Sequence, residues 1–303
     1  MLCENFRVLN TPFIPSNSIG SLQMLSPLGK LRPLLAVLIT THNRELETQK
    51  CLSHLLNATL PPHWDLSVHL TLDCCDPGTY ERLKADWPEV QFYSSSKPLY
   101  WGGGSLLAWR QSLHLSPSAW LLLNQDTYLY PSALTSLFYT QSSRPLAICA
   151  GKTWDPRTNS ISYGGWEFHP RKIGQFTPHS TLSSMANGNA LLIGIDTYQK
   201  IGKLNPIFSH RLGDFDYTLT GTKLGIKTLL PQFPIAQCEK TPPPPLQGTW
   251  KQRLLHPKNL DLVAQTAFLW KHAPASLPLL TLKTLIHATF PTVWKKLRDN
   301  IQV

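Results

Sequence analysis

Uninterrupted apolar runs mark two positions in the first half of the chain. One spans 34–39 (LLAVLI) and the other spans 120–123 (WLLL), and polar residues follow each run. Runs of this kind are typical of strands buried on both faces of a parallel sheet. Between them, the alternating residues 66–72 predict a half-buried strand, and a shorter strand is expected at 90–93.

Helical patterns separate these strands. Helices are expected over 45–56 and 80–86, and apolar residues with helical spacing occur in 105–115. Residues 101–104 (WGGG), just before the third helix, are expected to form a loop. The alternation of strand and helix predicts an α/β fold with a mostly parallel sheet, flanked by helices and joined by right-handed crossovers.

The second half of the chain has a different pattern. A glycine break within 160–168 predicts antiparallel hairpin strands, and an apolar strand is expected at 190–195. A helix is expected from about 214 to a terminating Gly225, and a short strand at 226–230 follows it. The result is a second group of shorter elements after the regular alternation.

A proline run at 242–245 marks a boundary, because consecutive prolines continue neither helix nor sheet. We therefore predict three parts. They are an irregular N-terminal segment (1–33), an α/β domain (34–235) and a helical, basic C-terminal extension (236–303).

Length and composition favour a folded, cytoplasmic protein. With 303 residues and a hydrophobic share of 42%, the chain can bury a substantial core. No segment reaches the roughly 18 apolar residues of a membrane span, and 1–33 lacks the apolar region of a signal peptide. The six cysteines are scattered, and no CxxC pair predicts a zinc site.

The net charge of +10 points to a polyanionic neighbour. Residues 246–303 carry eight lysines and arginines against two aspartates, together with leucines and tryptophan. This combination suits peripheral attachment to an anionic membrane. A helical hairpin that packs on the main domain and leaves a solvated basic face explains the same pattern equally well.

Two aspartates follow predicted strands of one sheet. Asp73 ends the strand at 66–72, and Asp126 closes the sequence Asn124-Gln125-Asp126 after the strand at 120–123. Ligands bind beyond the carboxyl ends of parallel strands, so both carboxylates can face a cleft, with Asn124 on the same side as Asp126. Carboxylates beside a diphosphate make sense if Mg²⁺ or Mn²⁺ bridges them. Taken singly, each aspartate is better explained as a turn residue than as a metal ligand.

Two further segments have a chemical and a structural interpretation. The glycines after Trp101 can let the backbone approach a phosphate, although they match neither the dinucleotide-binding nor the P-loop pattern. Asp214 and Asp216 stand at a helix start, where Asp214 can cap free N–H groups or act as a general base toward a sugar hydroxyl.

Taken together and in order, these segments resemble the inverting family-two glycosyltransferases of the GT-A fold, which include rhamnosyl- and galactofuranosyltransferases. The resemblance covers about 34–230. It lies in the order of the following segments: Thr40-Thr41-His42-Asn43-Arg44, Asp73, Trp101-Gly102-Gly103-Gly104, Asn124-Gln125-Asp126 and Gly213-Asp214-Phe215-Asp216-Tyr217.

The resemblance implies roles for individual residues. Those assigned to the nucleotide donor are Thr40, Arg44, Asp73, Gly102, Gly103 and Asn124. Asp126 would bind Mg²⁺ or Mn²⁺ on the diphosphate, and Asp214 would be the catalytic base with support from Asp216. The residues assigned to the substrate pocket are Trp101, Asn187, Gly188 and Asn189. The chain departs from the family at Gln125, where an acid is common; a third metal ligand is not assigned, and His256 is the only candidate.

The implied function is inverting, metal-dependent transfer of a sugar from a UDP- or dTDP-sugar to a saccharide or lipid-linked saccharide in cell-surface polysaccharide synthesis. The expected location is the cytoplasm, at the inner face of the membrane. One alternative is a nucleotidyltransferase that makes nucleotide sugars, which would be expected to have a glycine-rich loop after its first strand. The other is a non-catalytic protein that binds saccharide or nucleic acid, although no nucleic-acid partner is expected.

Overall fold

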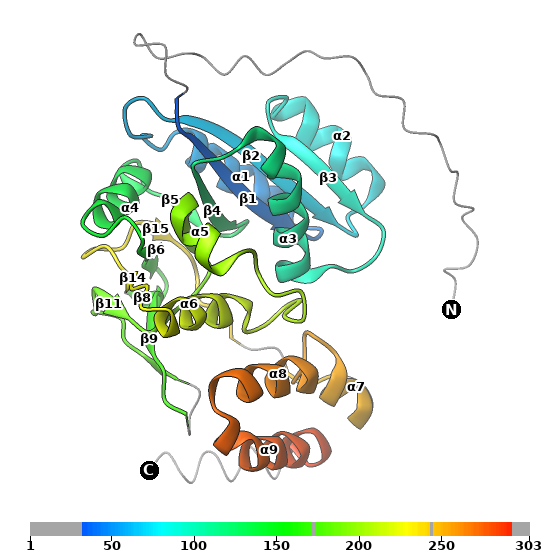
Figure 1. The fold of residues 1–303 in the computed structure, drawn as a ribbon. Helices are drawn as coiled ribbons and strands as arrows, with labels where there is room; N and C mark the ends of the chain where they lie inside the picture. The colour runs from blue at the N-terminus through cyan, green and yellow to red at the C-terminus, as the bar shows by residue number, and fades with distance from the viewer. Residues whose placement is uncertain (1–31, 171–173, 243–244, 293–303) are drawn as a thin grey trace. The chain divides into compact units, whose positions relative to one another are not determined.

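The computed structural model describes residues 32–170, 174–242 and 245–292 (Figure 1). The chain divides into two units, Met1–Arg32 and Pro33–Val303, and the elements below belong to the second. The predicted irregular segment 1–33 lies almost wholly outside the described residues.

Four parallel strands form the first half of the main sheet. They are β1 (Leu34–Thr41), β2 (Asp65–Asp73), β3 (Gln91–Ser95) and β4 (Ala119–Asn124), in the order β3-β2-β1-β4. The connecting helices are α1 (Glu45–Leu56), α2 (Pro77–Asp86) and α3 (Tyr100–Ser112). The predicted α/β alternation is therefore confirmed for this half.

The connecting helices cover opposite faces of these strands. Leu52 of α1 and Leu83 of α2 share one core cluster with Val37, whereas Trp109 of α3 packs with Leu38 in another. Val37 and Leu38 are neighbours in β1 and point to opposite faces, as the two-residue period of a strand requires. The chain reverses its direction of travel across the sheet between β1 and β4, and ligand crevices in α/β proteins open at such a point.

The second half of the main sheet is mixed in direction. Strand β13 (Ala190–Gly194) runs antiparallel to β4 on one side and to β6 (Ile148–Ala150) on the other. Strand β14 (Thr228–Leu229) pairs parallel with β6, and β11 (Leu182–Ser183) completes the edge. The run at 120–123 is buried as predicted, but its strand has a parallel neighbour on one side only.

Two small sheets flank this half. One contains β5 (Tyr128–Leu129), β15 (Ala236–Gln237), β7 (Thr153–Asp155) and β8 (Ser160–Tyr163). The other contains β10 (Gln175–Phe176), β9 (Gly165–Glu167) and β12 (Met185–Ala186). The antiparallel strands predicted within 160–168 are present as β8 and β9, but they do not pair with each other, because the chain passes from one small sheet to the other at Gly164.

Helices α4 (Ala133–Ser142), α5 (Ile195–Ile201) and α6 (Gly213–Lys223) complete this part. Gly225 follows α6 with a φ of 77°, a conformation that glycine adopts without strain, and the predicted helix end is confirmed. In the described residues after the proline run, the α-helices are α7 (Trp250–Leu255), α8 (Leu262–His272) and α9 (Leu277–Thr289). Within the described residues, no helix is long and apolar enough to cross a membrane.

Candidate active site

The crevice between β1 and β4 carries the first pair of predicted site residues. Thr40 and Asn124 are register partners at the ends of these strands. Beyond the ends, Nη1 of Arg44 donates to Oδ2 of Asp126 over 3.2 Å, and the Asp126 side chain keeps 30% of its surface exposed. Burial raises the pKa of Asp126, and the Arg44 guanidinium opposes that shift. A cation and an accessible carboxylate thus lie together at the reversal point of the sheet.

Asn124 and Asp126 do not share a side of the chain, contrary to the expectation from strand alternation. The strand ends at Asn124, and a turn follows in which the Thr127 N–H donates to the Asn124 carbonyl over 3.0 Å. Asn124 Oδ1 accepts a hydrogen bond from Nε1 of Trp101 over 2.7 Å, whereas Asp126 faces Arg44. The two-residue period holds only while the backbone stays extended.

Trp101 joins the end of β4 to the start of α6. Besides its bond to Asn124, its ring lies so close to Gly188 that a Cβ at that glycine would come within 2.7 Å of it. The same added Cβ would lie 3.1 Å from Cβ of Asp214. Trp101, Gly188 and Asp214 are therefore in contact, and the structure connects the Asn124 turn to Asp214 through them.

Asp214 lies in the first turn of α6, held by two backbone N–H groups. Gly188 N–H donates to Oδ2 over 2.8 Å, and Phe215 N–H donates to Oδ1 over 2.9 Å. Burial raises the pKa of Asp214, and these two N–H groups oppose the shift. A carboxylate whose pKa lies above the usual aspartate range is better matched to proton abstraction near neutral pH than an exposed one.

Asn187 and Asn189 flank Gly188 but point to different neighbours. Asn187 Oδ1 accepts a hydrogen bond from Nε1 of Trp166 over 2.8 Å, and Asn189 donates from Nδ2 to Oγ1 of Thr127 over 3.4 Å. Asn189 also accepts the Asn124 N–H through its backbone carbonyl, at 3.0 Å. Both side chains thus hold the segment that positions Gly188.

Cys238 is a site residue that the sequence did not single out. Its Sγ lies 4.0 Å from Oδ1 of Asp126 and 3.5 Å from Nδ2 of Asn189. Burial and the Asp126 carboxylate raise the pKa of this thiol to about 12, so it is uncharged at neutral pH. It follows β15, more than 100 residues from Asp126 in the sequence, and a lone cysteine carries no motif that could have placed it.

Asp73 has a different neighbourhood from Asp126. Its Oδ1 and Oδ2 accept hydrogen bonds from the backbone N–H groups of Leu99 and Tyr100, at 2.7 and 2.8 Å, and the residue is buried. These are free donors at the start of α3, which a carboxylate stabilises. The structure therefore places Asp73 as an anchor for α3, whereas the family resemblance implies a contact with the nucleotide.

The glycine run is the first turn of α3, and the prediction of a loop there is wrong. A Cβ at Gly102 would lie 2.1 Å from the Phe208 carbonyl oxygen, and one at Gly104 would lie 2.4 Å from Cγ2 of Thr40. Gly103 is less crowded, since its nearest neighbour would be Cβ of Leu99 at 3.2 Å. Glycine is thus required here for close packing inside a helix, a role that the sequence pattern alone does not distinguish from a loop.

Asp216 points away from Asp214. Its carboxylate is buried and receives Nε2 of His272 at 2.8 Å and Nζ of Lys271 at 2.8 Å, both from the end of α8. Residues two apart on a helix face different directions, which explains why the two aspartates separate. Asp216 joins α6 to the C-terminal helices.

His256, the candidate third metal ligand, lies beside Tyr100. Its Nε2 is 3.4 Å from the Tyr100 hydroxyl, and its Nδ1 accepts the N–H of Lys258 over 3.2 Å. The structure shows no contact between His256 and Asp126.

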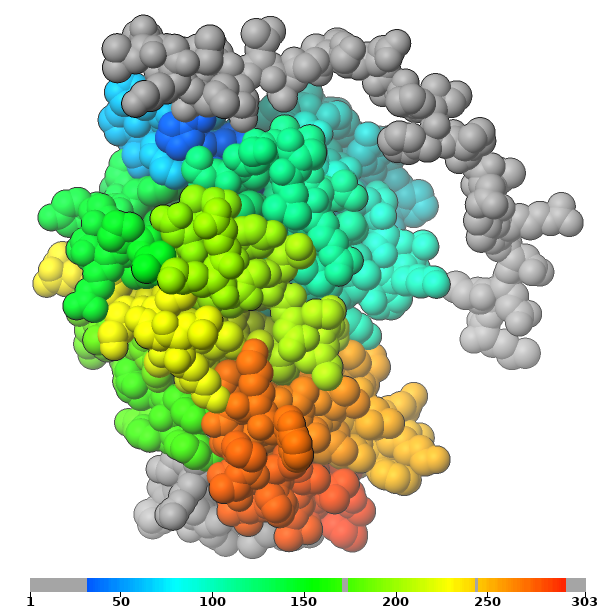
Figure 2. All heavy atoms as spheres, viewed as in Figure 1, coloured from blue at the N-terminus to red at the C-terminus, as the bar shows by residue number. Residues whose placement is uncertain are grey.

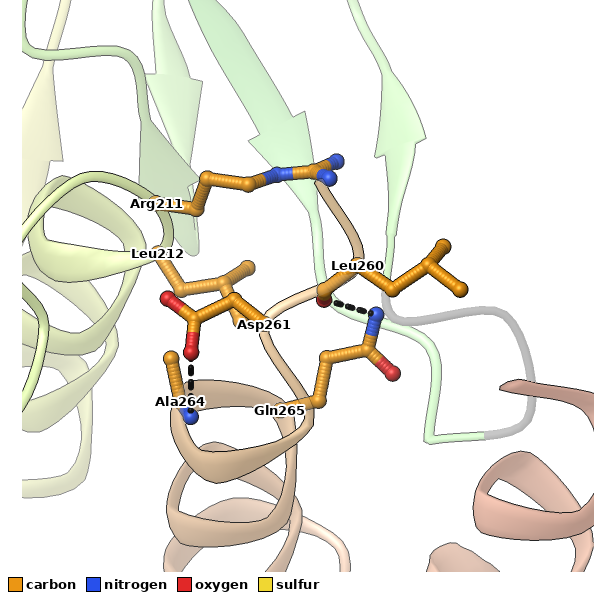
Figure 3. A pocket seen from close by; sticks show the side chains of 6 residues that line it. All are labelled: Arg211, Leu212, Leu260, Asp261, Ala264 and Gln265. Atoms are coloured by element: carbon orange, nitrogen blue, oxygen red, sulfur yellow. Dashed lines mark hydrogen bonds between the residues drawn. The ribbon is translucent and has the colours of Figure 1, made fainter. Parts of the chain in front are cut away.

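A cavity of about 70 Å³ opens between the segment before α6 and the start of α8 (Figure 3), and the residues that line it are Arg211, Leu212, Leu260, Asp261, Ala264 and Gln265.

Comparisons with known proteins leave the family open. No protein-family model matches the chain, and no curated protein matches it either. The function is therefore inferred from the geometry of the site.

Asp126 has the carboxylate at this site that a divalent cation could bind. Within the described ranges, no group of three or more His, Cys, Asp and Glu side chains could hold a metal ion. Asp126 has exposed carboxylate surface, whereas Oδ1 of Asn124 is already bound to Trp101. Mg²⁺ commonly takes one or two protein carboxylates and completes its shell with phosphates and water. Asp126 can serve Mg²⁺ or Mn²⁺ in that way.

Proposed function

We propose that the chain is an inverting glycosyltransferase of the GT-A fold that moves a sugar from a UDP- or dTDP-sugar to a saccharide or lipid-linked saccharide. Cell-surface polysaccharide synthesis, at the inner face of the membrane, is the proposed setting. The mixed sheet flanked by helices is compatible with this fold. The proposal rests chiefly on one observation, the contact chain from the Arg44–Asp126 pair past Asn124 and Trp101 to Asp214.

The first step of the proposed reaction is donor binding at the crevice. Arg44 supplies a cation for the diphosphate, and Asp126 supplies a carboxylate. A bound Mg²⁺ or Mn²⁺ would add positive charge against the leaving diphosphate. Because the Arg44 guanidinium already touches Asp126, a diphosphate that binds here exchanges one anionic partner of Arg44 for another.

The second step is deprotonation of the acceptor. The Asp214 carboxylate accepts the proton of the attacking hydroxyl, while Gly188 N–H and Phe215 N–H hold the carboxylate in place. The hydroxyl oxygen forms the new bond to the anomeric carbon as the bond to the diphosphate oxygen breaks on the opposite face. The configuration at that carbon is therefore inverted.

Two measurements test the proposal. UDP or dTDP should raise the melting temperature of the protein more in the presence of Mn²⁺ or Mg²⁺ than in their absence. A set of UDP- and dTDP-sugars should then show slow, metal-dependent hydrolysis of one donor. Stabilisation by oligonucleotides with steep salt dependence, and none by nucleotides, would instead support a nucleic-acid-binding protein.

A variant pair tests the base. Asp214→Asn should abolish transfer and leave nucleotide binding near the wild-type value, because the amide keeps the shape but cannot take a proton. Asp196→Asn is the matched control, since Asp196 also lies in a first helical turn but is exposed. Near-normal turnover by the Asp214 variant would remove the assignment of the base.

A further inference from the structure

The C-terminal helices expose an unusual amount of apolar surface. Half of the sixteen exposed large hydrophobic residues in the described part of the chain fall between 250 and 290. They are Trp250, Leu255, Val263, Trp270, Leu279, Leu282, Leu285 and Phe290. In Figure 2, α8 and α9, coloured orange to red, form a contiguous part of the visible surface. Exposed apolar residues scattered singly need no explanation, but residues gathered in one region do.

Helix α9 exposes leucines and buries a threonine, the reverse of an ordinary surface helix. Its buried residues are Thr284 and Ala288, whereas Leu279, Leu282 and Leu285 are exposed. Oγ1 of Thr284 donates to Oε1 of Gln265 over 2.6 Å, so a polar contact fixes the inner side. At 3.6 residues per turn, Leu279 and Leu282 lie opposite Thr284 and Ala288, and Leu285 lies at the edge between the two sides. A surface helix normally buries its leucines and exposes its threonines.

The packing of α8 shows that the extension does not need these leucines for its own core. Ala264 and Phe268 of α8 are buried against Phe208 and Leu219 in one hydrophobic cluster. Trp270, in the same helix, is 73% exposed. The apolar side chains that attach α8 to the rest of the protein are thus different from those that remain exposed.

The charge of this region identifies the kind of partner. In residues 245–292, the sole acidic side chain is Asp261, which is 5% exposed and caps α8 by accepting the Ala264 N–H. Lys251, Lys258 and Lys283 are exposed. An apolar surface with cations and without accessible acids is complementary to an anionic lipid surface. A second copy of this chain would place like charges against each other.

We propose that the outer face of α9, formed by Leu279, Leu282 and Lys283, docks on an anionic phospholipid surface. The leucines enter the boundary between headgroups and acyl chains, and Lys283 pairs with lipid phosphates. The helix lies in the plane of the interface, since no described helix is long and apolar enough to span a bilayer. The proposal does not depend on the reaction that the protein catalyses.

Co-sedimentation of the full chain with vesicles tests this proposal. Binding to vesicles that contain phosphatidylglycerol should be stronger than binding to pure phosphatidylcholine and should weaken with salt. Leu279→Ser combined with Leu282→Ser should weaken binding by about tenfold or more, because each leucine brings apolar area into the interface. Lys283→Gln should weaken binding about fivefold to the anionic vesicles alone.

A control pair separates this surface from general hydrophobicity. Leu46 and Leu224 are also exposed leucines, and they lie in α1 and just after α6. Leu46→Ser combined with Leu224→Ser should bind vesicles as the wild type does. No binding by the wild type to either vesicle would overturn the proposal. So would a dimer in solution that dissociates when Leu279 and Leu282 are replaced, or equal loss of vesicle binding in the control pair.

Discussion

Replacing Asp216 with alanine should lower the free energy of unfolding by about 3 kcal/mol, because it removes a buried charge partner. The Asp216 side chain is 4% exposed, and that of His272 is fully buried. Oδ1 of Asp216 lies 2.8 Å from both Nε2 of His272 and Nζ of Lys271, and its Oδ2 lies 3.0 Å from the same Nζ. These contacts join α6, which carries Asp214, to the end of α8.

The size of the stability loss depends on what Lys271 and His272 do after Asp216 is replaced. Hydrogen bonds to a charged group contribute about 1.5–3 kcal/mol each, and breaking a buried ion pair costs about 3–5 kcal/mol. Lys271 keeps 38% of its side-chain surface exposed and can turn to solvent, which places the loss at the lower end of that range. His272 has no exposed surface and must stay buried without its carboxylate.

Chemical denaturation with a helix signal measures the effect, and limited proteolysis reports on the C-terminal helices. Glu45→Ala is the matched control, because Glu45 also pairs with a cation, Arg82, at 2.6 Å, but on the surface. That change should cost less than about 1 kcal/mol, as surface pairs usually do. If Asp216→Ala is as stable as the Glu45 variant, and the helices resist protease as before, the structural role of Asp216 is refuted.

Three more predictions concern the site itself. Gly102→Ala should lower the free energy of unfolding by about 3 kcal/mol or more, since its Cβ would lie 2.1 Å from a carbonyl oxygen. Gly103→Ala should change it by less than about 1 kcal/mol, and equal effects of the two substitutions in a melting experiment would contradict this. By calorimetry, Arg44→Gln should weaken UDP binding with and without Mn²⁺, but Asp126→Ala should remove only the metal-dependent part; identical losses would argue against separate roles. Burial raises the pKa of Asp214 from 3.8, so this carboxylate takes up its proton at a higher pH than an exposed aspartate does. The wild-type rate should therefore fall as the pH is lowered and Asp214 becomes protonated, and a pH–rate profile without that fall would contradict its role as the base.

The parts of the fold that were predictable are those governed by local pattern. Strands β1, β2 and β4 and helix α1 have clear hydrophobic periods, and they were placed to within two residues. The antiparallel insertion of β13 beside β4 was not predictable, because an apolar run does not record the direction of its neighbour. The pairing of strands in the small sheets was not predictable for a related reason, since strands of two to four residues depend on partners far away in the sequence.

Sequence patterns predicted where the candidate residues lie in the fold, but only partly how they are arranged. Strand ends identified Asp126, and position at a helix start identified Asp214, yet neither pattern reveals which way a side chain points. Asp73 illustrates the limit, because its two backbone partners lie after β3 in the chain. Cys238 illustrates a second limit, because its closeness to Asp126 arises from the pairing of β15 with β5 and β7.

Glycine residues allow the two halves of the candidate site, the Asn124 turn and Asp214, to pack against Trp101. Side chains at Gly102, Gly188 or Gly213 would collide with or press on Phe208 or the Trp101 ring, so the approach of α3 to the segment before α6 depends on all three. This approach places Trp101 between the Asn124 turn and Asp214. Gly102, which in the sequence could belong to a phosphate-binding loop, thus serves close packing between α3 and the segment before α6. A side chain at Gly102 should therefore disturb both Asp126 and Asp214 through Trp101, although it would contact neither carboxylate.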